Sequence, residues 1–117
     1  MLSELGRPAD ALTAEQEAVT IGRELAAADP DTYRPGLAAT LDNLSVTLTE
    51  LRRPAEALAT ARQAVALYRE LDKQDGYRLD LCRSLGNLAQ AMKMLGQHED
   101  AAAVLTEERK LMLDLSS

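Results

Sequence analysis

Aromatic residues and cysteine are scarce in this sequence. Its 117 residues include no Trp, no Phe and three Tyr, and the single cysteine, Cys82, has no partner for an internal disulfide. A core of this composition has to be built from Leu and Ala, and Ala suits closely spaced helices. Strict alternation of apolar and polar residues is also absent, so a β-sheet has little support. The sequence therefore predicts an all-α protein.

Positive charge and long apolar runs are also in short supply. The chain has 13 Lys and Arg against 19 Asp and Glu, a formal net charge of −6. This excess of negative charge repels a phosphate backbone, so nucleic acid is not expected as a partner. A bilayer span needs about 20 consecutive apolar residues, and only short apolar runs occur, so no membrane association is expected. The lone cysteine agrees with a reducing compartment, and we expect a cytoplasmic protein.

Groups that carry catalysis, metal binding or cofactor binding do not converge in the sequence. The only histidine, His98, stands beside Glu99 and Asp100, so a zinc site there would have to draw its other ligands from oxygen. Cys82 has no nearby histidine in the sequence to activate it. The six glycines are scattered and form no phosphate-binding loop. We therefore expect no enzyme, no cofactor and no metal site.

One short segment occurs three times along the chain, as LGRPADAL from Leu5, LRRPAEAL from Leu51 and LGQHEDAA from Leu95. The copies begin 46 and 44 residues apart. Ahead of the second and third copies, apolar residues recur in steps of four and three, which is the helical period. This stripe comprises Leu37, Leu41, Leu44, Leu48 and Leu51, and then Leu81, Leu85, Leu88, Met92 and Leu95. The pattern predicts a repeating unit of a helix A, a tight turn, a helix B and a longer connection.

Proline, glycine and aspartate positions give the expected helix boundaries. Helix A is expected at Pro35–Leu51 and Tyr77–Leu95, and only the end of a first copy is present, at Met1–Leu5. Helix B is expected at about Pro8–Ala27, Pro54–Leu71 and Glu99–Leu115. The chain is thus predicted to form one domain over residues 1–117, with a partial repeat at 1–28 and full repeats at 35–74 and 77–115. This organisation gives about five helices plus a truncated first helix.

The two full repeats resemble the tetratricopeptide family. The resemblance rests on Leu41, Asn43, Leu44, Ser45, Leu48, Ala57 and Ala64, and again on Leu85, Asn87, Leu88, Ala89, Met92, Gly96 and Ala101. The repeat is longer than the usual length of about 34 residues, and with its NLS and NLA blocks it is similar to the long variety found in kinesin light chains and bacterial signalling arrays. The resemblance implies a helical-hairpin solenoid and a protein-interaction function.

Asn43 and Asn87 hold the same place in the two full repeats, and in tetratricopeptide proteins this place often faces the inner groove. An amide both donates and accepts hydrogen bonds, so the pair could hold the backbone of an extended peptide. The residues expected to contact the side chains of that peptide are Asp42, Val46, Glu50, Arg83, Gln90, Lys93 and Met94. In the alternative, each Asn bonds to the neighbouring repeat and only orients the helices. The basic residues that resemble a chaperone-tail clamp are absent, so an acidic chaperone C-terminus is disfavoured.

The first and last repeats depart from the pattern. In the first helix B, Gly22 stands where the second repeat has Tyr68, so stacking there is expected to be looser. In the last helix B, Glu108 and Arg109 favour a polar cap, whereas the apolar residues from Leu111 to Leu115 favour a continued contact.

Two functions are compatible with these features. The first is a module that binds a peptide or protein segment in the groove of the helix A layer, as a fragment of a larger array. The alternative is a structural module that forms a homo-oligomer through its unpaired repeat ends.

Overall fold

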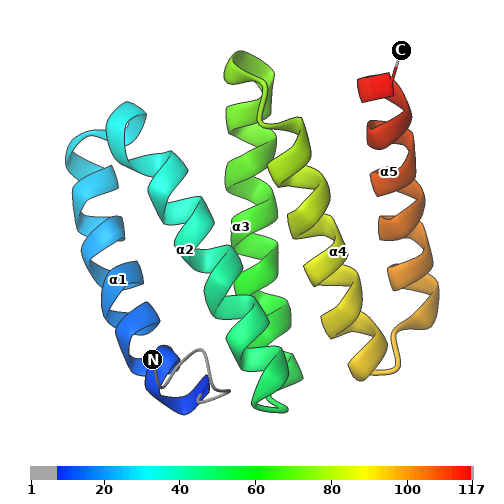
Figure 1. The fold of residues 1–117 in the computed structure, drawn as a ribbon, viewed down its shortest axis with the longest axis horizontal. Helices are drawn as coiled ribbons and strands as arrows, with labels where there is room; N and C mark the ends of the chain where they lie inside the picture. Colours follow the sequence, from blue (N-terminus) through cyan, green and yellow to red (C-terminus); the bar gives the residue numbers. More distant parts are fainter. Residues whose placement is uncertain (1–7, 117) are drawn as a thin grey trace.

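The computed structural model describes residues 8–116, and the regular structure in this part is entirely helical. The helices are α1 (Pro8–Ala28), α2 (Pro30–Glu50), α3 (Pro54–Asp75), α4 (Arg78–Met94) and α5 (His98–Ser116). Figure 1 shows them side by side in chain order, with consecutive helices antiparallel. The all-α helical-repeat fold is confirmed. The predicted end of an earlier helix A, at Met1–Leu5, lies outside the described residues.

Helix α2 begins at Pro30, before the expected start at Pro35. The side chain of Asp29 caps this helix, because its Oδ1 accepts the Thr32 backbone N–H at 3.4 Å. Pro30 then occupies the first turn, where a missing N–H costs nothing. Pro35 consequently lies inside the helix. The Asp29-Pro30 pair is therefore a helix start signal, within the stretch between Ala27 and Pro35 that the predicted boundaries left as a connection.

Helix α3 extends past the expected end at Leu71 and continues to Asp75. It ends at Gly76, whose φ of 71° lies in the left-handed region that glycine adopts without a Cβ penalty. The connection between α3 and α4 is correspondingly short. The long loop expected between the two full repeats is in large part helix.

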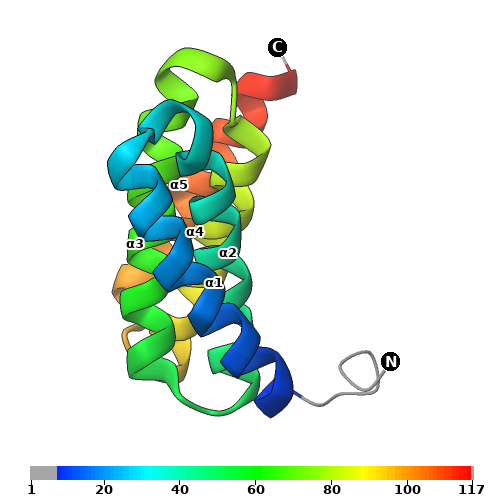
Figure 2. The same ribbon diagram turned by 90° about the vertical axis from the view of Figure 1, so that its left-hand side faces the viewer.

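The helices form two layers of unequal spacing. Helices α2 and α4 have Cα atoms within 8 Å of each other, whereas α1, α3 and α5 do not approach one another that closely in the described part of the chain. Long side chains span the wider layer: Arg23 donates to Gln63, and Arg69 forms an ion pair with Glu107. Figure 2 looks along this row from the α1 end. Because the α2/α4 layer is the tighter one, the row curves toward it and that layer forms the inner face.

Burial is concentrated in the middle of the row. Leu85 on α4 and Ala57, Ala61 and Ala64 on α3 are fully buried, and these small residues let neighbouring helices approach closely. Helix α1 buries only Val19 among its described residues. No helix within residues 8–116 combines the length and the apolar character needed to cross a bilayer.

Candidate functional site

A buried carboxylate, Asp42, joins the two inner helices α2 and α4. Its Oδ1 accepts the Ser84 hydroxyl at 2.7 Å and the Asn87 amide at 3.0 Å, and its Oδ2 accepts Arg83 Nε at 3.2 Å. The residue is 3% exposed. The sequence analysis placed Asp42 among the ligand-contacting residues, but its carboxylate lies below the surface and is occupied by donors from α4. Asp42 instead positions the side chains of α4 that do reach the surface.

Arg83 is the charged side chain that this carboxylate positions. Its Nη2 donates to Asp80 at 2.7 Å in addition to the bond with Asp42, and its side chain is 59% exposed. The hydrogen bond to Asp42, with a smaller contribution from Asp80, raises the pKa of Arg83. The two carboxylates fix the direction of the guanidinium, so the inner face carries an oriented cation that remains open to solvent.

A shallow hollow of about 120 Å³ lies between α2 and α4 on the inner face. Val46, Thr49 and Glu50 line it from α2, and Asn87 and Gln90 line it from α4. Val46 is 41% exposed, so the hollow has an apolar wall beside amide and carboxylate groups. Its volume is suited to one small side chain.

The remaining predicted contact residues lie around this hollow or away from it. Lys93 is exposed and Met94 is half-buried near the end of α4. Asn43 is exposed on α2 but does not line the hollow. The structure therefore brings Val46, Glu50, Asn87 and Gln90 together.

The two asparagines have different surroundings. Asn87 bonds to Asp42 of the preceding helix A, which matches the alternative in which the amide orients the helices. No such bond is found for Asn43 in the described part of the chain.

Sequence reasoning missed Ser84 and Thr49. Ser84 is fully buried and contributes the shortest of the three hydrogen bonds to Asp42. The repeat itself held a signal, because Ser84 lies 44 residues after another hydroxyl residue, Thr40. Thr49 bonds to the Ser45 carbonyl oxygen at 3.0 Å and carries no comparable pattern.

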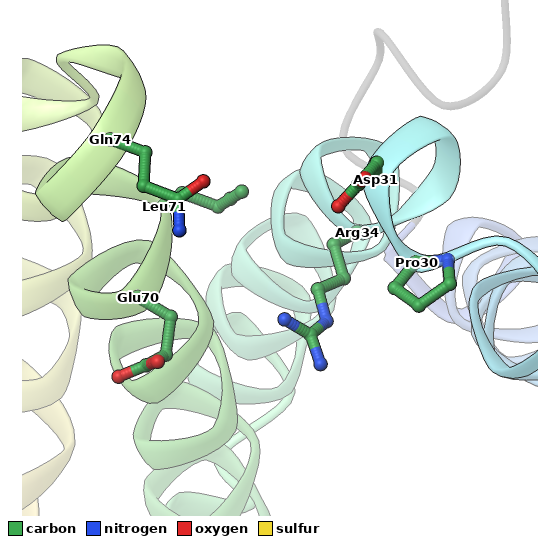
Figure 3. Close-up of a pocket in the computed structure, with 6 residues that line it drawn as sticks. All are labelled: Pro30, Asp31, Arg34, Glu70, Leu71 and Gln74. Atoms are coloured by element: carbon green, nitrogen blue, oxygen red, sulfur yellow. The ribbon is translucent and has the colours of Figure 1, made fainter.

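A second, polar hollow of about 310 Å³ lies between the start of α2 and the end of α3. Figure 3 shows Arg34 extending from α2 into the gap, with Glu70 on α3 across from it. Glu70 pairs with Lys73, and this pairing, with a smaller effect from Arg34, lowers the pKa of Glu70. In the next repeat the equivalent arginine, Arg78, bridges to Asp114 at 3.4 Å. The gap between Arg34 and Glu70 is thus the more open equivalent of the bridged contact between Arg78 and Asp114.

Within residues 8–116, no group of three or more His, Cys, Asp and Glu is placed to hold a metal ion. His98 is the first residue of α5, directly before Glu99 and Asp100. Cys82 is buried, and burial, reinforced by Glu108, raises the pKa of its thiol.

Antiparallel helix pairs that recur at a fixed spacing and pack only on their neighbours define an α-helical repeat protein. Residues 37–71 match the family model described as tetratricopeptide repeat. The chain therefore contains a tetratricopeptide repeat, and repeats of this family generally mediate protein–protein interactions. No curated protein and no solved structure matches the chain. The similarity to the kinesin-light-chain variety stays a prediction.

Proposed function

We propose that this protein binds a segment of a partner protein on the inner face formed by α2 and α4. The observation that carries the proposal is the hollow between Val46 and Gln90, next to an arginine whose direction two carboxylates fix. A small apolar side chain of the partner enters the hollow. Arg83 then contacts a carboxylate or carbonyl oxygen of the same segment.

The mixed charge of this face sets the kind of segment that fits. Glu50 lines the hollow, Arg83 lies one turn before Asn87 on α4, and Lys93 lies further along the same helix. A segment with alternating charge complements this pattern better than a uniformly acidic or basic one. Two inner helices present little surface, so we expect a small interface and weak binding from these repeats alone. We place this function in the cytoplasm and assign it no catalytic step.

Site-specific photo-crosslinking in the source cell tests the proposal. Benzoylphenylalanine replaces Gln90 on the inner face, and in a matched control it replaces Ala66, which is exposed on the outer helix α3. We expect the Gln90 position to give a discrete adduct with a partner protein and the Ala66 position to give none. Equal crosslinking at both positions, or none at Gln90, would contradict the proposal.

A pair of alanine substitutions then tests the amide. Asn87→Ala removes the amide that lines the hollow, and Asn43→Ala removes the repeat-equivalent amide outside it. We expect Asn87→Ala to reduce the adduct at Gln90 and Asn43→Ala to leave it unchanged. Thermal melting of both variants controls for the bond that Asn87 makes to Asp42.

Self-association is the second candidate function, and the C-terminal edge favours it. Leu79 and Leu113 are each 64% exposed there, and Leu115 is 47% exposed. Light scattering behind a sizing column, with reductant present, tests this function over a wide range of concentrations. A dimer that Leu79→Ser dissociates would support self-association, and a monomer at every concentration would exclude it.

A further inference from the structure

The contact between α2 and α4 shows how one repeat of this protein receives the next. Helix α4 contributes two neutral donors one turn apart, the hydroxyl of Ser84 and the amide of Asn87. Helix α2 contributes one buried carboxylate, Asp42, which accepts from both. The side of α4 that faces the preceding repeat is thus a donor side, and it meets a carboxylate of α2.

Helix α2 carries the same donor pair on its own preceding side. Thr40 and Asn43 lie 44 residues before Ser84 and Asn87, at the same helical spacing. Asn43 is exposed, and the Thr40 hydroxyl reaches only the Gly36 carbonyl oxygen of its own helix, at 2.9 Å. No hydrogen bond joins this pair to a carboxylate of residues 8–116, whereas Asp42 accepts from both members of the pair on α4. The edge formed by α1 and α2 therefore repeats the chemistry of an inter-repeat contact without its acceptor.

The same edge also holds an apolar hollow of about 340 Å³. It is lined by Ala18, Ile21, Gly22 and Leu25 of α1 and by Thr32, Tyr33, Gly36, Leu37 and Thr40 of α2. Ile21 is 56% exposed and Leu25 is 40% exposed. Adjacent exposed apolar side chains that line a concave surface mark a binding site more often than scattered ones do.

One substitution within the repeat accounts for this hollow. In the second repeat, Tyr68 of α3 is 2% exposed and packs beside Tyr77 at a ring distance of 6.2 Å. Its equivalent on α1 is Gly22, which has no side chain, and the equivalent of Tyr77 is Tyr33, which is 38% exposed. The first repeat thus has room for a large side chain that it does not itself supply.

We propose that the edge formed by α1 and α2 binds an amphipathic helix of a partner protein, in the position that an inner helix of a preceding repeat would take. The register of α2 on α4 defines the chemistry of this helix. Asp42 is the acceptor, and Ala38, one turn earlier, lies in the same buried cluster as Tyr68. The docking helix carries its own carboxylate at the place of Asp42. Four residues earlier it carries a large apolar side chain, because Gly22 leaves space that an alanine would not fill.

This site is separate from the inner-face hollow of the proposed function, since the two hollows share no lining residue. It also gives Asn43 a role that the inner face does not, as donor to the partner's carboxylate. Continuity with an interface that the molecule already uses is the reason to expect a helix here.

A synthetic peptide provides the probe. It has the sequence of residues 30–53 of this chain with Phe in place of Ala38 and a fluorescent label, and its binding to the full chain is followed by anisotropy. We expect saturable binding. A matched peptide that also carries Asp42→Asn should bind about tenfold more weakly, which is the size expected when a hydrogen-bonded charge is lost. No saturable binding, or equal affinity of the two peptides, would overturn the proposal.

Protein variants locate the bound peptide. Ile21→Ser should weaken binding of the Phe peptide about tenfold, since it removes an apolar wall of the hollow. Leu79→Ser, at a similarly exposed leucine on the opposite edge, should leave binding unchanged. Gly22→Tyr fills the hollow from within and should abolish binding. Circular dichroism has to confirm that this variant folds, because a Cβ at this position would meet Leu37 Cδ1 at 3.2 Å. If the wild-type chain is a dimer that Ile21→Ser dissociates, a second copy occupies the edge and the proposal fails.

Discussion

The contact between α2 and α4 and the edge between α1 and α2 are two versions of one interface. Both have a hydroxyl and an amide one turn apart on an inner helix, and in both that inner helix packs on the outer helix that precedes it in the chain. In the interior version, Asp42 accepts from the two donors and Tyr68 is buried. At the edge, no carboxylate of residues 8–116 accepts a hydrogen bond from the two donors, and Gly22 takes the place of the tyrosine. A closed contact and an open, apolar hollow thus differ by few residues.

The difference in packing predicts the largest effect on stability. Leu85→Ala, in the fully buried centre of α4, should lower the free energy of unfolding by about 2–5 kcal/mol, through lost burial and the cavity left behind. Ile21→Ala, at the 56% exposed edge, should change it by less than about 0.5 kcal/mol. Urea denaturation of both variants measures this contrast. Similar losses at the two sites would show that the edge is packed as tightly as the interior.

Substitutions at Asp42 and at its repeat equivalent, Gly86, are expected to change the free energy of unfolding in opposite directions. Asp42→Ala leaves the buried Ser84 and Asn87 donors without their acceptor and should cost about 1–3 kcal/mol. Gly86, the equivalent residue 44 positions later, has space for a Cβ, whose nearest neighbour is Glu108 Oε2 at 3.5 Å. Gly86→Ala should therefore raise stability by about 0.5–1 kcal/mol through helix propensity. The same denaturation experiment checks both signs, and destabilisation by Gly86→Ala would mean that α5 packs more tightly on α4 than this distance implies.

The repeat period predicted the inner helices well because their stripe of leucines is regular. Leu41, Leu44 and Leu48 are all buried, as the steps of four and three residues require. The start of α2 was missed because Asp29-Pro30 serves equally as a turn and as a capped helix start. Only the formed helix distinguishes the two.

The candidate site was predicted less completely than the fold. The face of a helix follows from its period, so the surface that contains Val46, Asn87 and Gln90 could be expected. Whether a polar residue on that face is exposed or bonded depends on the neighbouring helix. Asp42 and Asn87 bond to each other across two repeats, and no local pattern in the sequence pairs them. The equal spacing of Thr40 and Ser84 was the one usable signal for Ser84.

The turns between inner and outer helices offer a smaller comparison. Arg52 has a φ of 61°, and Gly96 at the equivalent turn has a φ of 78°. A residue with a Cβ is strained in this region, so Arg52→Gly should raise the free energy of unfolding by about 0.5–1 kcal/mol. Gly96→Ala should lower it by about 1 kcal/mol for the same reason. Thermal denaturation of the two variants tests the pair, and a loss of stability in Arg52→Gly would show that the arginine side chain makes compensating contacts.

The smallest expected effect concerns the two contacts that span the outer layer. Arg69 pairs with Glu107, whereas the equivalent Arg23 pairs with a neutral amide, Gln63. The side chains of Arg69 and Glu107 are 46% and 35% exposed, so solvent screens the pair and a double-mutant cycle should give a coupling energy of about 0.2–1 kcal/mol. Raising the salt concentration should reduce this coupling and leave that of Arg23 with Gln63 nearly unchanged. Glu107→Gln converts the first contact into the chemistry of the second. If its coupling to Arg69 keeps the salt dependence of the wild type, the carboxylate is not the source of that dependence.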